Sequence, residues 1–426
     1  MKLRSAVLLV SLIFLPITAR VWAQEAHASN EPVKLADLLA EAERDNPQIQ
    51  AARHAWRAAQ QMPSQISTLP DPQFVLQHLS VGSPRPFAGY TNSDFAYVGL
   101  GFSQDIPYPG KLHLRGEIAK KDVDVSQQQY ESVRRVVLTE VKTAYFQLAY
   151  LSKRRAILKG DQDLLQQVEQ AAEARYRSGM GNQQEIIQAQ LQQTKLLREI
   201  TENELERAKV QAELKQALNR SQTSADLETL ELSETAATYS YDQLLSAAKA
   251  NNPEIAGAQK MLEKQGLQID LAKKDFYPDF NLQYMWQRTD PTQFRAYYMI
   301  TFGVRVPIYR KRKQQPGLAQ AQADQDRARS EYEMQSQHIA FQLQQQYLDA
   351  EKSEQLLRIY REGLIPQARA ELQAGLAAYQ SNRLDFQALL ASFLDVLKLD
   401  EEYWQTLSQH ETAFSQIEGI TGLSLR

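Results

Sequence analysis

The feature that most constrains this 426-residue chain is an internal duplication, in which the second half imperfectly copies the first. The clearest match is Asn46-Pro47 with Asn252-Pro253, about 206 residues further on. Further matches, at offsets of about 200 to 206, join Phe74 to Phe280, Phe102 to Phe302, Pro107 to Pro307, Lys111 to Lys311, Gly160 to Gly363 and Tyr176 to Tyr379. Self-similarity on this scale is typical of one structural unit that is built twice. We therefore expect two similar halves.

The N-terminus predicts export. Lys2 and Arg4 precede an apolar run over 6–17, and Val21-Trp22-Ala23 resembles a small-residue cleavage site. The run has about 12 residues, whereas a helix that spans a bilayer needs roughly 20. Residues 1–23 are therefore predicted to be a signal peptide, followed by an N-terminal tail over 24–33. No later segment has 18 consecutive apolar residues, so we expect any passage through a membrane to use strands.

Composition narrows the chemistry. The chain has no cysteine, which excludes disulfides and thiolate metal sites. Its 48 basic and 51 acidic residues are spread along the sequence with a net charge of -3, so no nucleic-acid partner is indicated. The histidines form no close cluster with carboxylates, and no phosphate loop, nucleophile elbow or paired-carboxylate motif is present. We expect no metal site, no cofactor and no enzyme activity.

Two long segments are predicted to be helical rods. In 112–177 and 316–380, apolar residues recur at alternating steps of four and three, which is coiled-coil spacing. Pro366 lies inside the second segment, where the missing N–H predicts a bend just after Gly363. Four shorter helices are expected, and their lengths favour end-to-end stacking in pairs beside the two rods. These shorter helices cover 34–62, 182–219, 242–276 and 384–414.

Each copy also contains a predicted β-hairpin, at about 72–106 and about 278–306. Apolar residues alternate with polar ones in both, and the first hairpin has a long loop over 81–94. Each strand has roughly ten residues, the length that crosses a bilayer when tilted. A small soluble sheet is the alternative. The residues expected to face lipid are Leu100, Phe102, Phe280, Leu282, Tyr284, Trp286, Tyr298, Ile300 and Phe302.

Four strands cannot close into a membrane barrel, and open strand edges in lipid cost several kcal/mol per unpaired group. Two chains would supply eight strands and three would supply twelve. Only the wider barrel leaves an open lumen, because side chains fill an eight-stranded one. A homotrimer is therefore favoured.

The predicted organisation is a first repeat over 34–219, a linker over 220–241, a second repeat over 242–414 and a tail over 415–426. Helix, hairpin, long helix, turn and helix follow one another twice. This order resembles the TolC-type outer-membrane efflux channels over almost the whole mature chain. The most specific pieces are the two Asn-Pro pairs, the turn 174–179 and the passage Ser103-Gln104-Asp105-Ile106-Pro107-Tyr108-Pro109-Gly110-Lys111. The last is similar to members that serve cation or heavy-metal efflux pumps.

The resemblance implies a trimer with a twelve-stranded barrel in the outer membrane, continued by a helical barrel across the periplasm. It also implies that the two turns 178–181 and 381–383 form the periplasmic mouth, where a periplasmic adaptor protein docks. Many members carry acidic residues beyond this turn, but here the second copy has Ala388 and Ala391. Acids in a first helical turn also stabilise the helix dipole, so capping is the alternative role for Glu185 and Asp385. The gate and adaptor-contact candidates are Arg175, Arg177, Gly179, Met180, Glu185, Asn382, Arg383 and Asp385.

The preferred functional hypothesis is a passive exit duct in the outer membrane. An inner-membrane pump, expected to be of the resistance-nodulation-division type, would expel solutes through it by way of the adaptor, and metal cations are one expected cargo. Two alternatives stay open at this point. One is a periplasmic coiled-coil scaffold or adaptor, and the other is an exit duct for type I protein secretion.

Overall fold

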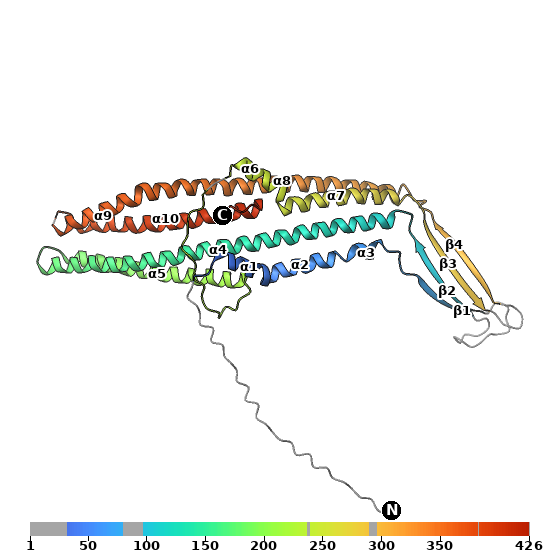
Figure 1. Cartoon of the computed structure of the whole chain (residues 1–426), viewed down its shortest axis with the longest axis horizontal. Helices are drawn as coiled ribbons and strands as arrows, with labels where there is room; N and C mark the ends of the chain where they lie inside the picture. Colours follow the sequence, from blue (N-terminus) through green and yellow to red (C-terminus); the bar gives the residue numbers. More distant parts are fainter. Residues whose placement is uncertain (1–31, 80–96, 237–238, 289–295, 382, 426) are drawn as a thin grey trace, which may run out of the picture. The chain divides into compact units, whose positions relative to one another are not determined.

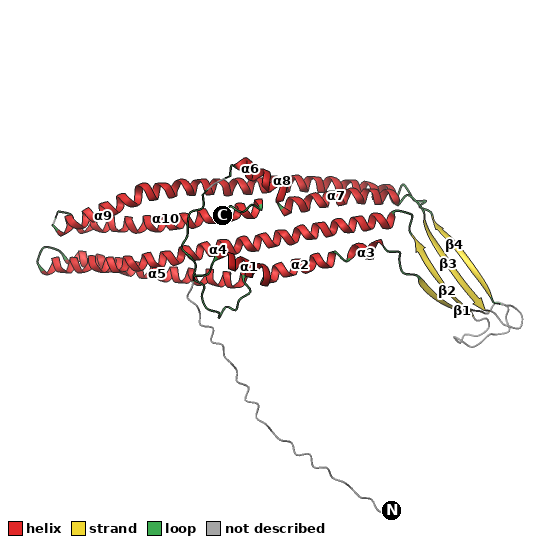
Figure 2. Cartoon of the chain, viewed as in Figure 1, coloured by secondary structure: helices red, strands yellow, loops and turns green. Residues whose placement is uncertain are grey.

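A computed structural model describes residues 32–79, 97–236, 239–288, 296–381 and 383–425. The predicted signal peptide, most of the N-terminal tail, the first hairpin's loop and Asn382 lie outside these residues, so nothing is said of their structure. The predicted architecture of long helices with four strands per chain is confirmed (Figure 2).

The strands are β1 (Gln73–Leu79), β2 (Tyr97–Ile106), β3 (Asp279–Arg288) and β4 (Tyr297–Arg305). They form one antiparallel sheet in the order β1-β2-β3-β4, in which β2 of the first copy pairs with β3 of the second (Figure 1). The first and last strands are the two edges. Within the described residues, neither edge has a further strand hydrogen-bonded to it.

The first long rod is a single helix, α4 (Lys111–Arg177). Gly110, at φ 90°, ends the strand-to-helix passage in a left-handed conformation that favours glycine. The second rod consists of α8 (Gln314–Ile359), a π-helix (Tyr360–Leu364) and α9 (Ile365–Gln380), without a break between them. The expected distortion at Pro366 is thus a π-turn in an otherwise continuous helix.

A difference in length between the two copies explains the π-turn. Before it, buried positions of the two rods match at an offset of 202, as with Leu151 and Ser353. Beyond it they match at 203, as with Leu165 and Ala368. The second rod therefore holds one extra residue, and a π-helix, with i to i+5 hydrogen bonds, accommodates one residue without disturbing the faces on either side.

Strand pairing revises the sequence alignment in the same way. Phe74 pairs with Phe102, whereas its counterpart Phe280 pairs with Val304. Val304, and not Phe302, is thus the structural equivalent of Phe102. The shift is two residues, and side chains alternate faces with a period of two, so the predicted faces of the strands do not change.

The shorter helices flank the rods. The first-copy helices α1 (Leu35–Asp45), α2 (Pro47–Ala59), α3 (Met62–Ser67) and α5 (Gln183–Ala217) contact α4. The second-copy helices α6 (Tyr241–Asn251), α7 (Pro253–Lys274) and α10 (Phe386–Thr421) contact α8, and α7 and α10 also contact α4. The helix expected over 384–414 is α10, which continues to Thr421. The single helices expected over 34–62 and 242–276 are each interrupted, at Asn46 and at Asn252.

The Asn-Pro pairs join stacked helices end to end. Asn46 caps α2, since its Oδ1 accepts hydrogen bonds from the N–H groups of Gln48 and Ile49. Its Nδ2 donates to the carbonyl oxygen of Ala217 at 2.8 Å, at the end of α5. Asn252 makes the same contacts in the second copy and donates to the carbonyl oxygen of Ile420 at 3.1 Å. One buried side chain thus satisfies the orphan groups of two helix ends.

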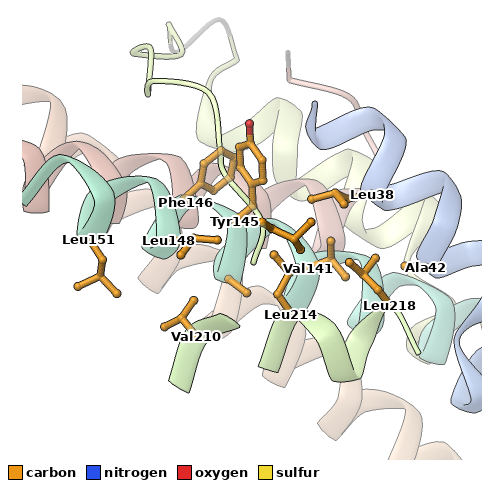
Figure 3. Packing of buried hydrophobic residues seen from close by; sticks show 12 residues of the cluster. Leu38, Ala42, Val141, Tyr145, Phe146, Leu148, Leu151, Val210, Leu214 and Leu218 are labelled. Atoms are coloured by element: carbon orange, nitrogen blue, oxygen red, sulfur yellow. The ribbon is translucent and has the colours of Figure 1, made fainter. Parts of the chain in front are cut away.

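The core of the first copy surrounds the middle of α4 (Figure 3). Tyr145 and Leu148 of α4 pack with Leu38 of α1 and Leu214 of α5. The segment after α5 is held on this core by two hydrogen bonds. Gln211 Nε2 donates to the carbonyl oxygen of Leu227, and Gln211 Oε1 accepts the N–H of Leu227.

One half-buried acid works against stability. Asp161 lies on α4, and its Oδ2 is buried with no hydrogen-bond partner among the described residues. Burial, followed by repulsion from Asp400 and Glu401 of α10 and Glu199 of α5, raises its pKa to about 7. Arg369 pairs with Asp400 at 2.9 Å and Arg154 with Glu401 at 2.6 Å, so the neighbouring acids have partners that Asp161 lacks.

Asp161→Asn is predicted to stabilise the protein at pH 8 and to have little effect near pH 5. A carboxyl with a raised pKa keeps its proton in the folded state, so its destabilising effect develops as the pH rises from about 4 to 7. The expected gain at pH 8 is on the order of 1 kcal/mol, because solvent screens this partly exposed group. Thermal unfolding followed by circular dichroism at both pH values measures it. Asp400→Asn is the control and should give no such gain; equal gains for Asp161→Asn at both pH values would contradict the prediction.

Candidate functional site: the sheet face and the helix tips

One face of the sheet is apolar across all four strands. The register aligns Leu100 with Trp286 and Phe102 with Tyr284, and Tyr284 in turn with Ile300. Most of these side chains are exposed in the single chain. All nine predicted lipid-facing residues lie on this face, together with Phe74, Leu76 and Val304.

The opposite face is mostly polar or lacks large side chains. Asn281 Nδ2 donates to Ser103 Oγ at 3.0 Å and to Asp105 Oδ1 at 3.0 Å. Met285 lies over Gly101, where an added Cβ would be 2.4 Å from the carbonyl oxygen of Tyr284, so this close approach requires glycine. The sheet thus separates an apolar surface from a polar one.

The strand-to-helix passage that carried the family resemblance has a structural role. The buried Lys111 places its Nζ 3.0 Å from Asp279 Oδ1 and 3.1 Å from Asp275 Oδ1. Tyr108 donates its backbone N–H to Asp279 and stacks on Tyr277 at 4.6 Å between ring centroids. These contacts fasten the start of the first rod to the second copy.

The tip of the first copy is closed by a glycine stop. Gly179 has φ 73°, and the N–H groups of Met180 and Gly181 both donate to the carbonyl oxygen of Arg175, at 2.9 and 3.1 Å. This pattern is the usual end of a helix at a left-handed residue. It turns the chain from α4 into α5, whose N-cap Asn182 accepts the N–H of Glu185.

At the tips, a polar network joins the two copies. Arg175 of α4 donates to the backbone oxygen of Tyr379 at 2.8 Å, and its guanidinium lies 4.4 Å from the centre of the Tyr379 ring. The Tyr379 hydroxyl donates to Glu185 Oε2 at 3.1 Å. Tyr379 is only 1% exposed and also contacts Phe386 of α10. We call Arg175, Tyr379 and Glu185 the tip latch.

The protonation of the latch follows from its surroundings. Burial first, and then the hydrogen bond and the charge of Glu185, raise the pKa of Tyr379 to about 12. The phenol therefore stays a neutral hydrogen-bond donor at any physiological pH. Cation–π contacts of buried rings contribute about 2 kcal/mol and hydrogen bonds to charged groups about 1.5 to 3, so the latch is a substantial local interaction.

The other candidates have local partners. Arg177, 78% exposed, pairs with Glu173 one turn earlier on its own helix at 2.9 Å, and such exposed pairs contribute little. Asp385 caps α10 by accepting the N–H of Ala388 at 2.8 Å. Arg383 and Met180 are exposed at the turns. Of the eight candidates, the structure brings Arg175 and Glu185 together across the copies, through Tyr379.

Tyr379 was not among the predicted site residues. Its identity as a repeated tyrosine was visible in the sequence, but its role depends on residues that are not repeated. The first-copy counterpart, Tyr176, is 48% exposed. Ala378 and Ala388 stand where the first copy has Arg175 and Glu185. Among the described residues, the latch therefore forms once, around Tyr379 of the second copy.

Tyr379→Phe is predicted to loosen the tips without unfolding the chain. Losing the bond to Glu185 should cost about 1 to 2 kcal/mol locally and speed amide hydrogen exchange severalfold in 176–186 and 379–388. Mass-spectrometric hydrogen exchange measures this. Tyr176→Phe removes the same atom from the exposed counterpart and should leave exchange unchanged; a similar response to both substitutions would show that the latch has no special role.

Two other kinds of site are absent from the described residues. No helix there combines the length and apolar character needed to cross a membrane. No group of three or more His, Asp or Glu side chains in the described part of the chain is arranged to hold a metal ion.

Comparison with known proteins identifies the family. The sequence model described as outer membrane efflux protein matches residues 38–220 and 244–396, one stretch in each copy. No curated protein sequence matches significantly. Among solved structures, the outer-membrane channel OprN is similar with a TM-score of 0.79 at 17% identity, over 92% of this chain and 90% of that one. VceC from Vibrio cholerae gives 0.78 at 16% identity over 92% and 97%, and CusC gives 0.77 at 16% identity over 91% of each chain. These low identities establish a shared fold, and the family match covers well over half of the sequence. The chain therefore belongs to the outer membrane efflux protein family.

Proposed function

We propose that this protein is the outer-membrane exit duct of a tripartite efflux system. Three copies close a twelve-stranded barrel, and their helices form a duct across the periplasm. An inner-membrane pump of the resistance-nodulation-division type expels solutes through it by way of a periplasmic adaptor, which docks at the tips. The duct acts as a passive conduit, without catalysis.

The observation that carries this proposal is the sheet. Its apolar face holds exposed Phe, Leu, Ile, Tyr and Trp side chains, which favour lipid over water. Its two edge strands leave backbone groups that lipid cannot satisfy. When the edge strands pair with strands of further copies to close a barrel, these backbone groups form hydrogen bonds. The polar face of the sheet then lines the lumen of the barrel. A soluble scaffold would expose the apolar face to water.

Ile300→Arg is predicted to impair membrane insertion, and Thr301→Arg is not. The two residues are adjacent on β4 and lie on opposite faces, Ile300 on the apolar face. An arginine on the lipid face costs about 2 to 4 kcal/mol near the bilayer midplane, whereas a lumen substitution is tolerated. The measurement is the amount of each variant that remains in salt-washed outer membranes, which should fall for Ile300→Arg and stay at the wild-type level for Thr301→Arg. If wild-type protein leaves the membrane in salt, the scaffold alternative is favoured.

The tip latch is proposed to keep the periplasmic mouth narrow. In planar bilayers the wild-type trimer should conduct weakly, and Arg175→Ser should raise the single-channel conductance severalfold because the tips of the two copies are then no longer held together. Arg177→Ser is the control, since its partner lies on its own helix. The absence of any conductance from a membrane-inserted trimer of either variant would refute the duct.

Metal-cation cargo is the finer part of the proposal. It rests on the likeness of the Pro-Gly-Lys passage to members that serve cation pumps. Lys111 of that passage already forms ion pairs with Asp275 and Asp279, so this passage has a structural role. We therefore expect ion selectivity to arise at the mouth, where Glu185 is the acid of the tip latch. Reversal potentials in the same bilayer recordings measure it, and a preference for cations that Glu185→Gln abolishes is the expected result.

A further inference from the structure

A run of four cations follows the last strand of the sheet. Arg310, Lys311, Arg312 and Lys313 lie between β4 and α8, and all four side chains are exposed. Among the described residues, ion pairs form before the run and after it, at Arg305 and Arg327, but none includes a residue of the run. The sequence has no acidic residue between positions 290 and 324. Because adjacent like charges repel one another, this run favours an anionic partner.

The fold does not require so much charge at this place. The first copy passes from strand to rod through Pro107-Tyr108-Pro109-Gly110-Lys111, in which Lys111 is the one cation. Lys111 is 3% exposed and pairs with Asp275 and Asp279. A single buried and paired lysine thus completes the passage in the first copy. The four exposed cations of the second copy therefore need another explanation.

The chain just before the run is apolar and exposed. Phe302 and Val304 lie on the apolar face of β4. Val306, Ile308 and Tyr309 follow the strand and are 56%, 72% and 69% exposed. The order of apolar residues, tyrosine and cations is typical of a segment at a membrane surface. There, apolar side chains enter the acyl layer, tyrosine lies at the level of the headgroups and cations reach the phosphates.

A second group of aromatic and basic side chains lies at the same end of the sheet. The register pairs Asp279, at the start of β3, with Arg305, at the end of β4. Tyr277 lies just before β3 and stacks on Tyr108, which follows β2. Lys274 Nζ is 5.8 Å from the centre of the Tyr277 ring. The rods begin at this end of the sheet (Figure 1), so aromatic and basic side chains gather where strands give way to helices.

We propose that the basic run 310–313 binds the phosphate groups of anionic phospholipids. This inference rests on the proposed membrane barrel, in which the sheet spans the outer membrane and the rods extend into the periplasm. The end of the sheet where the rods begin then lies in the periplasmic leaflet. The arginines donate paired N–H groups to a phosphate and the lysines add point charges, while Ile308 and Tyr309 contact the acyl chains beside the headgroup.

Lipid titration of the purified protein in mild detergent tests this site. The probes are phosphatidylglycerol and phosphatidylcholine with identical acyl chains, one of which carries a dye whose fluorescence anisotropy reports binding. Wild-type protein should bind phosphatidylglycerol about tenfold more tightly, and high salt should remove this preference because mobile ions screen exposed charges. Arg310→Gln with Arg312→Gln should weaken phosphatidylglycerol binding about tenfold and leave phosphatidylcholine binding unchanged.

Two controls identify the ligand and the position of the site. Arg329→Gln with Arg358→Gln removes the same charge from exposed positions further along α8 and should change neither affinity. Equal losses in the two double variants would show a general effect of charge and overturn the site. Glycerol phosphate, which has a phosphate but no acyl chain, should compete weakly. If it binds as tightly as phosphatidylglycerol, the run is a site for soluble anions and the lipid proposal is wrong.

The outcomes separate this inference from the proposed function. Wild-type protein that remains in salt-washed outer membranes, yet binds the two lipids equally, would overturn the lipid site and leave the duct standing. Wild-type protein that leaves the membrane in salt would overturn the duct, and the lipid site with it. Should the arginine double variant fail to fold, the wild-type protein decides alone: a salt-sensitive preference for phosphatidylglycerol supports the site, and equal affinities overturn it.

Discussion

The pairing of β2 with β3 is the contact on which the rest of the structure depends, because it places the two copies side by side in one chain. From that pairing the contact continues along the rods. Lys111 pairs with Asp279 where the strands end, and Lys121 with Glu263 and Lys264 with Asp122 link α4 to α7 at 2.7 and 2.6 Å. Further along, Lys142 pairs with Glu418 and Arg154 with Glu401, both at 2.6 Å. Single pairs of this kind contribute little, so apolar packing supplies most of the stability and the charges fix which faces meet.

The sequence predicts the periodic parts of this structure well. Strand faces follow from a period of two and rods from heptad spacing, so neither prediction depends on knowing the offset of the copies to the residue. The Asn-Pro pair also had a local signature, since asparagine before a first-turn proline is a helix start. Its second role, the bond from Asn46 to Ala217 at the end of α5, joins residues far apart in sequence and had no local signal.

The parts that the sequence did not reveal are those that depend on the differences between the copies. The π-turn results from one extra residue, and Phe102 with Phe302 is a sequence match that the strand pairing does not follow. Asp161 resembles any polar position of a coiled coil until α10 brings Asp400 and Glu401 beside it. Tyr379 is likewise one of two repeated tyrosines, and only the contacts with Arg175 and Glu185 distinguish it. Packing between distant segments decides each of these cases.

The duplication therefore has two consequences that act in opposite directions. Where the copies are alike, equivalent junctions share one contact geometry, as with Asn46 and Asn252, which each cap one helix and donate to the end of another. Where the copies differ, the junctions become unequal. Arg175 and Glu185 hold Tyr379 between the two tips of one chain, whereas Ala378 and Ala388 offer Tyr176 neither a cation nor a carboxylate. Shared geometry fixes how the helices meet within each copy, and the few residues that break the repeat give the tips their separate chemistry.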